Sequence, residues 1–157
     1  MAVATCTVVS GGGGWTATGA AYPANQNDGN NGTYQAWPGD TAGTNSNYYD
    51  YTQIPDGAII SNVAVSGEWG AGSASATASF RYVDGSSETL GSVGDVASYS
   101  FSSNLHPSGA AWTKANVATM HMDTVSLQTG NGNTMKLYSS VLSVTYVMSG
   151  DMFVSIY

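Results

Sequence analysis

The sequence predicts an all-β protein: a two-sheet antiparallel sandwich of jelly-roll-like form, with a long polar loop near the N-terminus. Three observations predict this class. Apolar and polar residues alternate in many short segments, which is typical of strands with one buried face. Turn-forming residues separate these segments at intervals of about 8–12 residues, as in sandwiches and barrels. No stretch has the helical spacing of apolar residues, and the 20 Gly residues interrupt the whole chain.

Residues 74–83 form the clearest predicted strand. Alanine and aromatic residues occupy one face of this segment, and serine, threonine and Arg81 occupy the other. Asp84-Gly85 follows and is a strong hairpin signal. We therefore expect residues 88–90 to lie in the partner strand.

Residues 59–67 form a second strand, which follows the turn residues Pro55-Asp56-Gly57. Regular alternation places Ile59, Val63 and Val65 on one face, with Ser61 between them. This face is expected to be buried.

Residues 135–148 are a long β-branched run near the C-terminus. Alternation gives one apolar face made of Leu142, Val144, Tyr146 and Met148. Asn131-Gly132-Asn133 separates this run from residues 117–128, so the two segments are expected to form a hairpin.

The rest of the chain supplies shorter strands and one long loop. The shorter strands are expected at residues 3–9, 15–18, 33–37, 48–53, 97–101 and 152–156. Residues 19–47 are rich in Asn and Gly and are expected to be largely an ordered loop. We expect one domain over residues 1–157, in which residues 1–14 are an N-terminal strand with a Gly-rich joint and residues 150–157 an apolar C-terminal strand.

Charge excludes two classes of partner. Three Lys and Arg residues against ten Asp and Glu give a net charge of −7, and charged residues make up 8% of the chain. So few cations cannot neutralise a run of phosphates or anchor the chain at an anionic membrane, so neither nucleic acid nor membrane is expected as a partner. No secretory signal or apolar run long enough to span a membrane is visible.

The sequence offers no catalytic, cofactor or metal site. His106 and His121 are fifteen residues apart and Cys6 is remote from both, so ordinary hydrogen-bonded roles are expected for the histidines. His121 and Asp123 share a strand face, but no nucleophile accompanies them to complete a triad. Glu68 beside Trp69 lacks a second carboxylate and is interpreted as a strand-end residue. We expect no enzyme activity and no cofactor.

Two loops superficially suggest ligand sites. Residues 25–32 have the oxygen-rich composition of a calcium loop but only one acid, Asp28, so a turn cluster is favoured over a weak calcium site. The run Gly11-Gly12-Gly13-Gly14 lacks the lysine and helix of a phosphate loop and is interpreted as a flexible joint.

Two apolar regions are candidate contacts with other subunits or a coat. Tyr48, Tyr49 and Tyr51 cluster in a short strand, which predicts either packing or an exposed platform for sugars. The C-terminal segment would be an aggregation hazard as a free edge, so we expect it to be paired or covered by a neighbour. Its candidate contact residues are Met152, Phe153, Val154, Ile156 and Tyr157.

Three motifs in order resemble a loose group of β-sandwich virion proteins of tailed bacteriophages. They are an I-P-x-G-A-x-I strand entry in Ile54-Pro55-Asp56-Gly57-Ala58-Ile59-Ile60-Ser61-Asn62-Val63-Ala64-Val65, a W-T loop in Ala111-Trp112-Thr113-Lys114-Ala115-Asn116-Val117, and a closing strand in Val141-Leu142-Ser143-Val144-Thr145-Tyr146-Val147. The resemblance covers about residues 48–147 and its motifs are structural rather than catalytic.

The resemblance implies a structural role in a virion, produced in the cytoplasm of a host bacterium. A small chain without fibre repeats favours a capsid decoration (cement) protein on the capsid surface. Its partners would be the major capsid protein and copies of itself, as a homo-oligomer such as a trimer, and binding would stabilise the assembled shell by mass action. The alternative is a tail-associated receptor- or carbohydrate-binding module that contacts a glycan through Trp37 and the tyrosine cluster.

Overall fold

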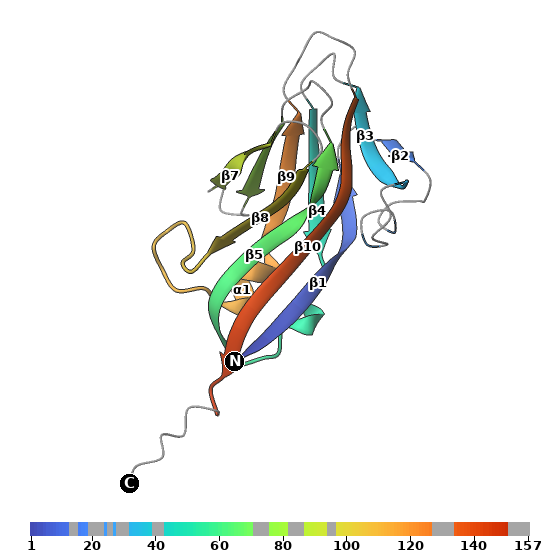
Figure 1. Ribbon diagram of the computed structural model, residues 1–157. Coiled ribbons are helices and arrows are strands. Elements are labelled where there is room, and N and C mark those ends of the chain that lie inside the picture. Colours follow the sequence, from blue (N-terminus) through green and yellow to red (C-terminus); the bar gives the residue numbers. More distant parts are fainter. Residues whose placement is uncertain are drawn as a thin grey trace.

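The computed structural model describes residues 1–12, 16–18, 24, 27, 32–38, 43–70, 76–81, 87–93, 97–126 and 134–150. The strands form two layers, with β5 and β10 in front of β4 and β9 (Figure 1). The elements are β1 (Ala2–Gly12), β2 (Thr16–Thr18), β3 (Tyr34–Pro38), β4 (Gly43–Tyr49), the 3₁₀ turn η2 (Tyr51–Gln53), β5 (Ala58–Gly70), β6 (Ala76–Arg81), β7 (Ser87–Val93), β8 (Ala97–Ser103), α1 (Lys114–Ala118), β9 (His121–Ser126) and β10 (Thr134–Met148).

The strand order is that of a jelly roll. One layer, sheet A, has the order β2-β3-β10-β5-β8, and the other, sheet B, has the order β4-β9-β6-β7. Every pairing is antiparallel, and along the chain β3, β5, β8 and β10 fall in sheet A while β4, β6, β7 and β9 fall in sheet B. The eight strands from β3 to β10, four in each sheet and linked by these crossovers, have the arrangement of a jelly roll, and β2 extends sheet A beside β3. The predicted all-β, two-sheet fold is confirmed.

The first strand joins the two sheets along one side. Residues 2–7 of β1 pair with β10, and residues 8–12 pair with β4, with a register shift between Val8 and Ser10. Val8 no longer pairs with β10, and the side chain of Asn27 forms hydrogen bonds with its backbone instead. Its Oδ1 accepts from the Val8 amide at 3.1 Å and its Nδ2 donates to the Val8 carbonyl at 2.8 Å. Asn27 thus has a structural role in the polar 25–32 segment.

The core lies between the sheets. Fully buried side chains from sheet A include Val63, Val65 and Leu142, and Val8 and Tyr49 reach them from the other side. Each fully buried Val or Leu contributes about 1.5–3 kcal/mol relative to exposure. The sandwich is therefore held mainly by apolar burial between the layers.

A β-bulge changes which isoleucine is buried in β5. Thr145 pairs with Asn62 and Tyr146 with Ile60, so Ser61 is an extra residue without a direct opposite. The extra residue reverses the alternation beyond it. Ile60 is therefore 5% exposed, in the core, and Ile59 is 43% exposed. The prediction that Ile59 shares the buried face with Val63 is wrong for this reason.

Buried hydroxyl groups connect the strands where a second bulge interrupts β10. The register shifts between Leu137 and Ser139. The Tyr99 hydroxyl donates to the Ser139 carbonyl oxygen at 3.0 Å, and it passes Gly67 so closely that an added Cβ there would lie 2.5 Å from it. Across the layers, the hydroxyls of Tyr49 and Ser140 are 2.6 Å apart. Gly67 is therefore required by close packing.

Two predictions about the segment before β9 are wrong. Residues 117–128 do not form one strand, because Val117 lies in α1 and β9 begins at His121. A capping box between Thr113 and Asn116 starts this helix, a local signal that apolar periodicity overlooks. The expected hairpin between residues 117–128 and 135–148 is also wrong, since β9 pairs with β4 and β6 in the other sheet.

The remaining predictions have mixed outcomes. The hairpin across Asp84-Gly85 is confirmed by the pairing of β6 with β7, although the turn itself lies outside the described residues. The strands at residues 3–9, 33–37 and 97–101 are confirmed, whereas residues 51–53 form η2 rather than strand. The loop at residues 19–47 is shorter than expected, because β3 and most of β4 lie within it. The strand at residues 152–156 lies outside the described residues, as does Trp15.

Candidate functional site

The tyrosine cluster divides between the core and the surface. Tyr49 is 2% exposed and packs in the core, edge-to-face with Tyr51 at a ring separation of 6.5 Å. Tyr51 is half-buried and its hydroxyl donates to the carbonyl oxygen of Met120. Only Tyr48 is exposed, at 42%. A platform made of all three tyrosines is therefore wrong, because Tyr49 and Tyr51 are packing residues.

Tyr48 forms an aromatic pair with His121 on the outer face of sheet B. The two residues are direct partners in the pairing of β4 with β9. Their rings stack at 4.8 Å between centroids with an interplanar angle of 26°. Along β4 the alternate residues Asn45, Asn47 and Tyr49 are buried on the inner face. Tyr48 lies between them in sequence and therefore points to the outer face. The arrangement is a preformed aromatic surface on a rigid sheet.

Polar positions surround this pair in the sheet register. Ser10 of β1 is the partner of Tyr48 on the other side. Arg81 of β6 is the register partner of His121, and Asp123 of β9 is the register partner of Ser46. Residues that lie directly opposite each other on paired antiparallel strands point to the same face of the sheet. Among these positions, Ser10 and Ser46 have described side chains, and the register places both beside Tyr48.

The other candidate residues have structural environments. His106 is buried, its Nδ1 lies 2.9 Å from the Ser108 hydroxyl, and its ring packs edge-to-face on Trp112. Glu68 is half-buried in β5. Burial, with a smaller effect of the Asp50 charge, raises the pKa of the Cys6 thiol to about 11, so this thiol is not an activated nucleophile. Among the described residues no group of three or more His, Cys, Asp or Glu could hold a metal ion.

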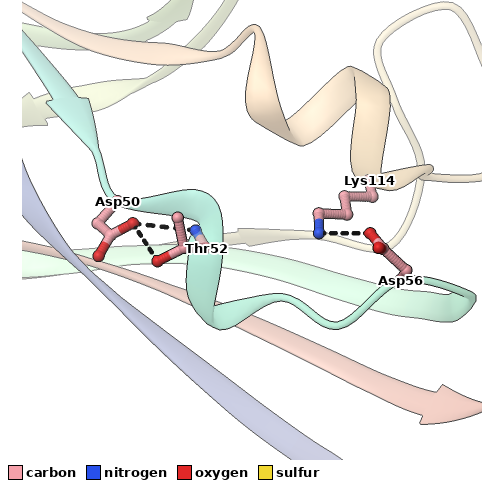
Figure 2. Close-up of polar contacts among 4 residues, drawn as sticks. All are labelled: Asp50, Thr52, Asp56 and Lys114. Carbon is pink, nitrogen blue, oxygen red and sulfur yellow. Dashed lines mark hydrogen bonds and ion pairs between the residues drawn. The ribbon is translucent and has the colours of Figure 1, made fainter.

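Two acidic side chains, Asp50 and Asp56, form local polar contacts at the end of the sandwich near α1 (Figure 2). Asp50 Oδ1 accepts from the Thr52 amide at 3.0 Å and from its hydroxyl at 2.6 Å, capping η2. These hydrogen bonds lower the pKa of Asp50. Asp56 forms an ion pair with Lys114 Nζ at 2.8 Å, which lowers the pKa of Asp56. Each carboxylate has a local structural partner, which is consistent with turn-fixing roles.

The C-terminal contact candidates Met152, Phe153, Val154, Ile156 and Tyr157 lie outside the described residues. The side chain of Trp37 is also not described, although its backbone lies in β3. Within the described part of the chain, no helix has the length and apolar character needed to cross a membrane.

No family model matches the chain, and no curated protein matches it. Several solved structures resemble it, and carbohydrate-binding modules are among them. The family 29 module CBM29-2 matches with 10% identity and a TM-score of 0.47, covering 100% of both chains. The module CBM6cm-2 of Cellvibrio mixtus lichenase 5A matches with 11% identity and a TM-score of 0.42, covering 92% of this chain and 98% of the module. Scores and identities this low establish no common family and carry no functional argument.

Sequence reasoning missed His121 as the partner of Tyr48. These residues are 73 positions apart in the chain, and their contact depends on the pairing of β4 with β9. The alternation around Tyr48 correctly placed it on the face opposite Tyr49, but it did not indicate which of the two faces is exposed.

Proposed function

We propose that this chain is a non-catalytic binding module that recognises a neutral carbohydrate through the outer face of sheet B. The observation that carries the proposal is the exposed Tyr48 ring, held in a stack with His121 at 4.8 Å. An aromatic face provides an apolar surface for the C–H face of a sugar ring, and its hydroxyl tip provides a hydrogen-bonding group.

The energetics favour this surface as a binding site. The stack restrains both side chains before any ligand arrives, so binding loses little side-chain entropy. Ser10 and Ser46 lie next to Tyr48 in the sheet, one across the β1 pairing and one two residues earlier in β4. With a net charge of −7, the chain repels acidic polymers, which favours a neutral ligand.

Affinity electrophoresis in gels that contain neutral polysaccharides, followed by calorimetry with the matching oligosaccharide, tests this proposal. We expect wild type to be retarded by at least one neutral polysaccharide, and the variants Y48A and H121A to lose at least tenfold in affinity. The matched control is L105A, which removes another exposed apolar side chain, 52% exposed, from the segment after β8. Retardation that Y48A leaves unchanged, or no retardation of wild type by any polysaccharide, would contradict the proposal.

A second proposal is the virion role: a capsid decoration protein on the capsid surface, with the major capsid protein as partner. It is supported by the bacteriophage resemblance and by the exposure of Met1 (91%) and Ile59 at the end of the sandwich where β1 begins. The motif residues Ile54, Trp112 and Leu142 are all buried, so the motif supports the fold and does not indicate where in a virion the protein lies. Removing the protein from purified particles and adding it back, with shell stability to heat as readout, tests this role. Unchanged shell stability with reduced adsorption to host cells would contradict it.

A further inference from the structure

The turn that leads into β5 contains the dipeptide Asp56-Gly57. The side chain of Asp56 is 98% exposed, and Gly57 has no side chain that would shield its amide nitrogen. In such a dipeptide the backbone nitrogen can attack the side-chain carboxyl of the residue before it. We infer that Asp56 is a site of spontaneous isoaspartate formation and that its ion pair with Lys114 slows this modification.

The modification is a cyclisation followed by a hydrolysis. The Gly57 nitrogen forms a bond to Cγ of the protonated Asp56 carboxyl, and its proton leaves with one carboxyl oxygen as water. The product is a five-membered succinimide ring. Water then adds to one of the two ring carbonyls and breaks its bond to nitrogen. Cleavage at Cγ restores aspartate, whereas cleavage at the main-chain carbonyl leaves Gly57 attached through Cγ, which is isoaspartate.

The turn holds the reacting atoms apart. The Ala58 amide donates to the Pro55 carbonyl oxygen at 3.3 Å, and Gly57 has a φ of +76°, as in the third position of a type II turn. Ring closure requires the Gly57 nitrogen to eclipse Cβ of Asp56, which is about a third of a full rotation in ψ away from type II geometry. Fully buried Ile54 and the pairing of Ala58 with β10 fix the turn on both sides. The reaction therefore proceeds only from a locally opened turn.

The ion pair acts on the carboxyl group itself. Lys114 reaches from α1 to Asp56, with its Nζ 2.8 Å from Oδ1 (Figure 2). The protonated carboxyl can lose water, whereas the carboxylate is a poor electrophile. The hydrogen bond from Lys114, together with its charge, favours the carboxylate and lowers the pKa of Asp56. An exposed ion pair changes such an equilibrium by about two- to fivefold, so Lys114 slows cyclisation by this factor.

Isoaspartate at position 56 would also change the turn. The main chain then runs through Cβ and is one carbon longer, and the free carboxylate lies on Cα. This carboxylate is no longer placed to meet Lys114, so α1 loses its ion pair with the turn. The added carbon lies directly before Ala58, where the pairing of β5 with β10 begins. We therefore expect the converted protein to unfold at a lower urea concentration than the unmodified one.

Ageing of the full chain near neutral pH at raised temperature, followed by peptide mapping with electron-transfer mass spectrometry, tests this inference. We expect isoaspartate at position 56 in wild type, and about two- to fivefold faster formation in K114A. The matched control K136A removes the same charge, but Lys136 pairs with Gly70 at the far end of β5, so this variant should age like wild type. The variant D56E keeps the carboxylate and should give no such product, because a six-membered ring closes much more slowly. Equal rates in K114A and wild type, or no isoaspartate at position 56 in either, overturn the inference.

Salt separates the effect of charge from a loosened turn in K114A. Screening weakens an exposed ion pair, so high salt should raise the wild-type rate to that of K114A and leave the variant unchanged. An excess rate of K114A that persists in high salt would overturn the electrostatic role of Lys114. Asp28-Gly29 and Asp84-Gly85 share the dipeptide but lie outside the described residues, so the peptide map must assign the product to position 56. Neither readout depends on carbohydrate, so failure of the proposed function and failure of this inference are distinguishable.

Discussion

Replacing Gly67 by Ala tests the close packing at the second bulge of β10. A Cβ at this position would lie 2.1 Å from the carbonyl oxygen of Ser139 and 2.5 Å from the hydroxyl of Tyr99. Both contacts are far inside van der Waals distance, and the nearer one is to backbone, which cannot rotate away. The strands β5 and β10 must therefore separate locally in the variant.

Two opposing effects set the magnitude for G67A. Overpacking costs about 1–3 kcal/mol, and loss of the hydrogen bond from Tyr99 to Ser139 adds about 1 kcal/mol. Alanine also lowers the conformational entropy of the unfolded chain, which raises the free energy of unfolding by about 0.4–1 kcal/mol. The clash dominates, so we expect G67A to lower the free energy of unfolding by about 1–3 kcal/mol.

Urea unfolding followed by circular dichroism measures this change. Gly150 has nothing within 4 Å of an added Cβ, so G150A is the matched control and should be neutral or slightly stabilising. The double variant G67A/Y99F removes the hydroxyl but leaves the clash with the Ser139 carbonyl, so it should not recover stability. If G67A is as stable as G150A, or if Y99F rescues it, the packing argument is refuted.

Three further predictions concern buried and charged groups. The variant Y49F removes the hydrogen bond between Tyr49 and Ser140 across the layers, and urea unfolding should show a loss of about 1 kcal/mol; S140A should then cost less in the Y49F background, and full additivity would refute the coupling. The folded-state pKa of Cys6, about 11 against 9.0 for a free thiol, means that stability falls as pH rises through this range; a thiol reagent should label native protein only at the rate of opening, and rapid labelling at neutral pH would contradict this. The pKa of Asp56 is lowered by Lys114, so its contribution is present above the ordinary carboxyl value and lost as pH falls through the lowered one; an NMR titration should show this pKa rising towards 3.8 in K114A, and an unchanged value would exclude the ion pair.

Alternation was a reliable guide wherever strands are regular. Val63 and Val65 are fully buried as their pattern predicts, and so are Leu142 and Val144. The pattern failed at Ile59, because the bulge at Ser61 adds a residue that only the opposite strand reveals. Bulges depend on pairing, so one strand read alone gives the wrong face beyond them.

The short helix α1 shows a second limit of prediction from sequence patterns. Five residues are too few for an apolar periodicity, and a search for periodicity overlooks the local capping signal of Thr113 and Asn116. The hairpin expected between residues 117–128 and 135–148 failed because the connection crosses between sheets, and a turn signal does not distinguish a hairpin from a crossover.

For the candidate site, the sequence identified Tyr48 as lying on the face opposite Tyr49, but it could not separate a surface residue from a core residue. That distinction required the second sheet, which covers Tyr49 and leaves Tyr48 in solvent. The partner His121 is set by the β4–β9 register, a contact between segments far apart in the chain.

By itself the sequence determined the all-β class, most of the strands and the scarcity of charge, because these follow from local alternation and composition. Only the tertiary structure decided which strands pair, where the bulges reverse the faces, and which residues lie around Tyr48. The physical reason is that each strand buries one face against a sheet contributed by distant segments, so exposure belongs to the assembled sandwich rather than to any segment alone.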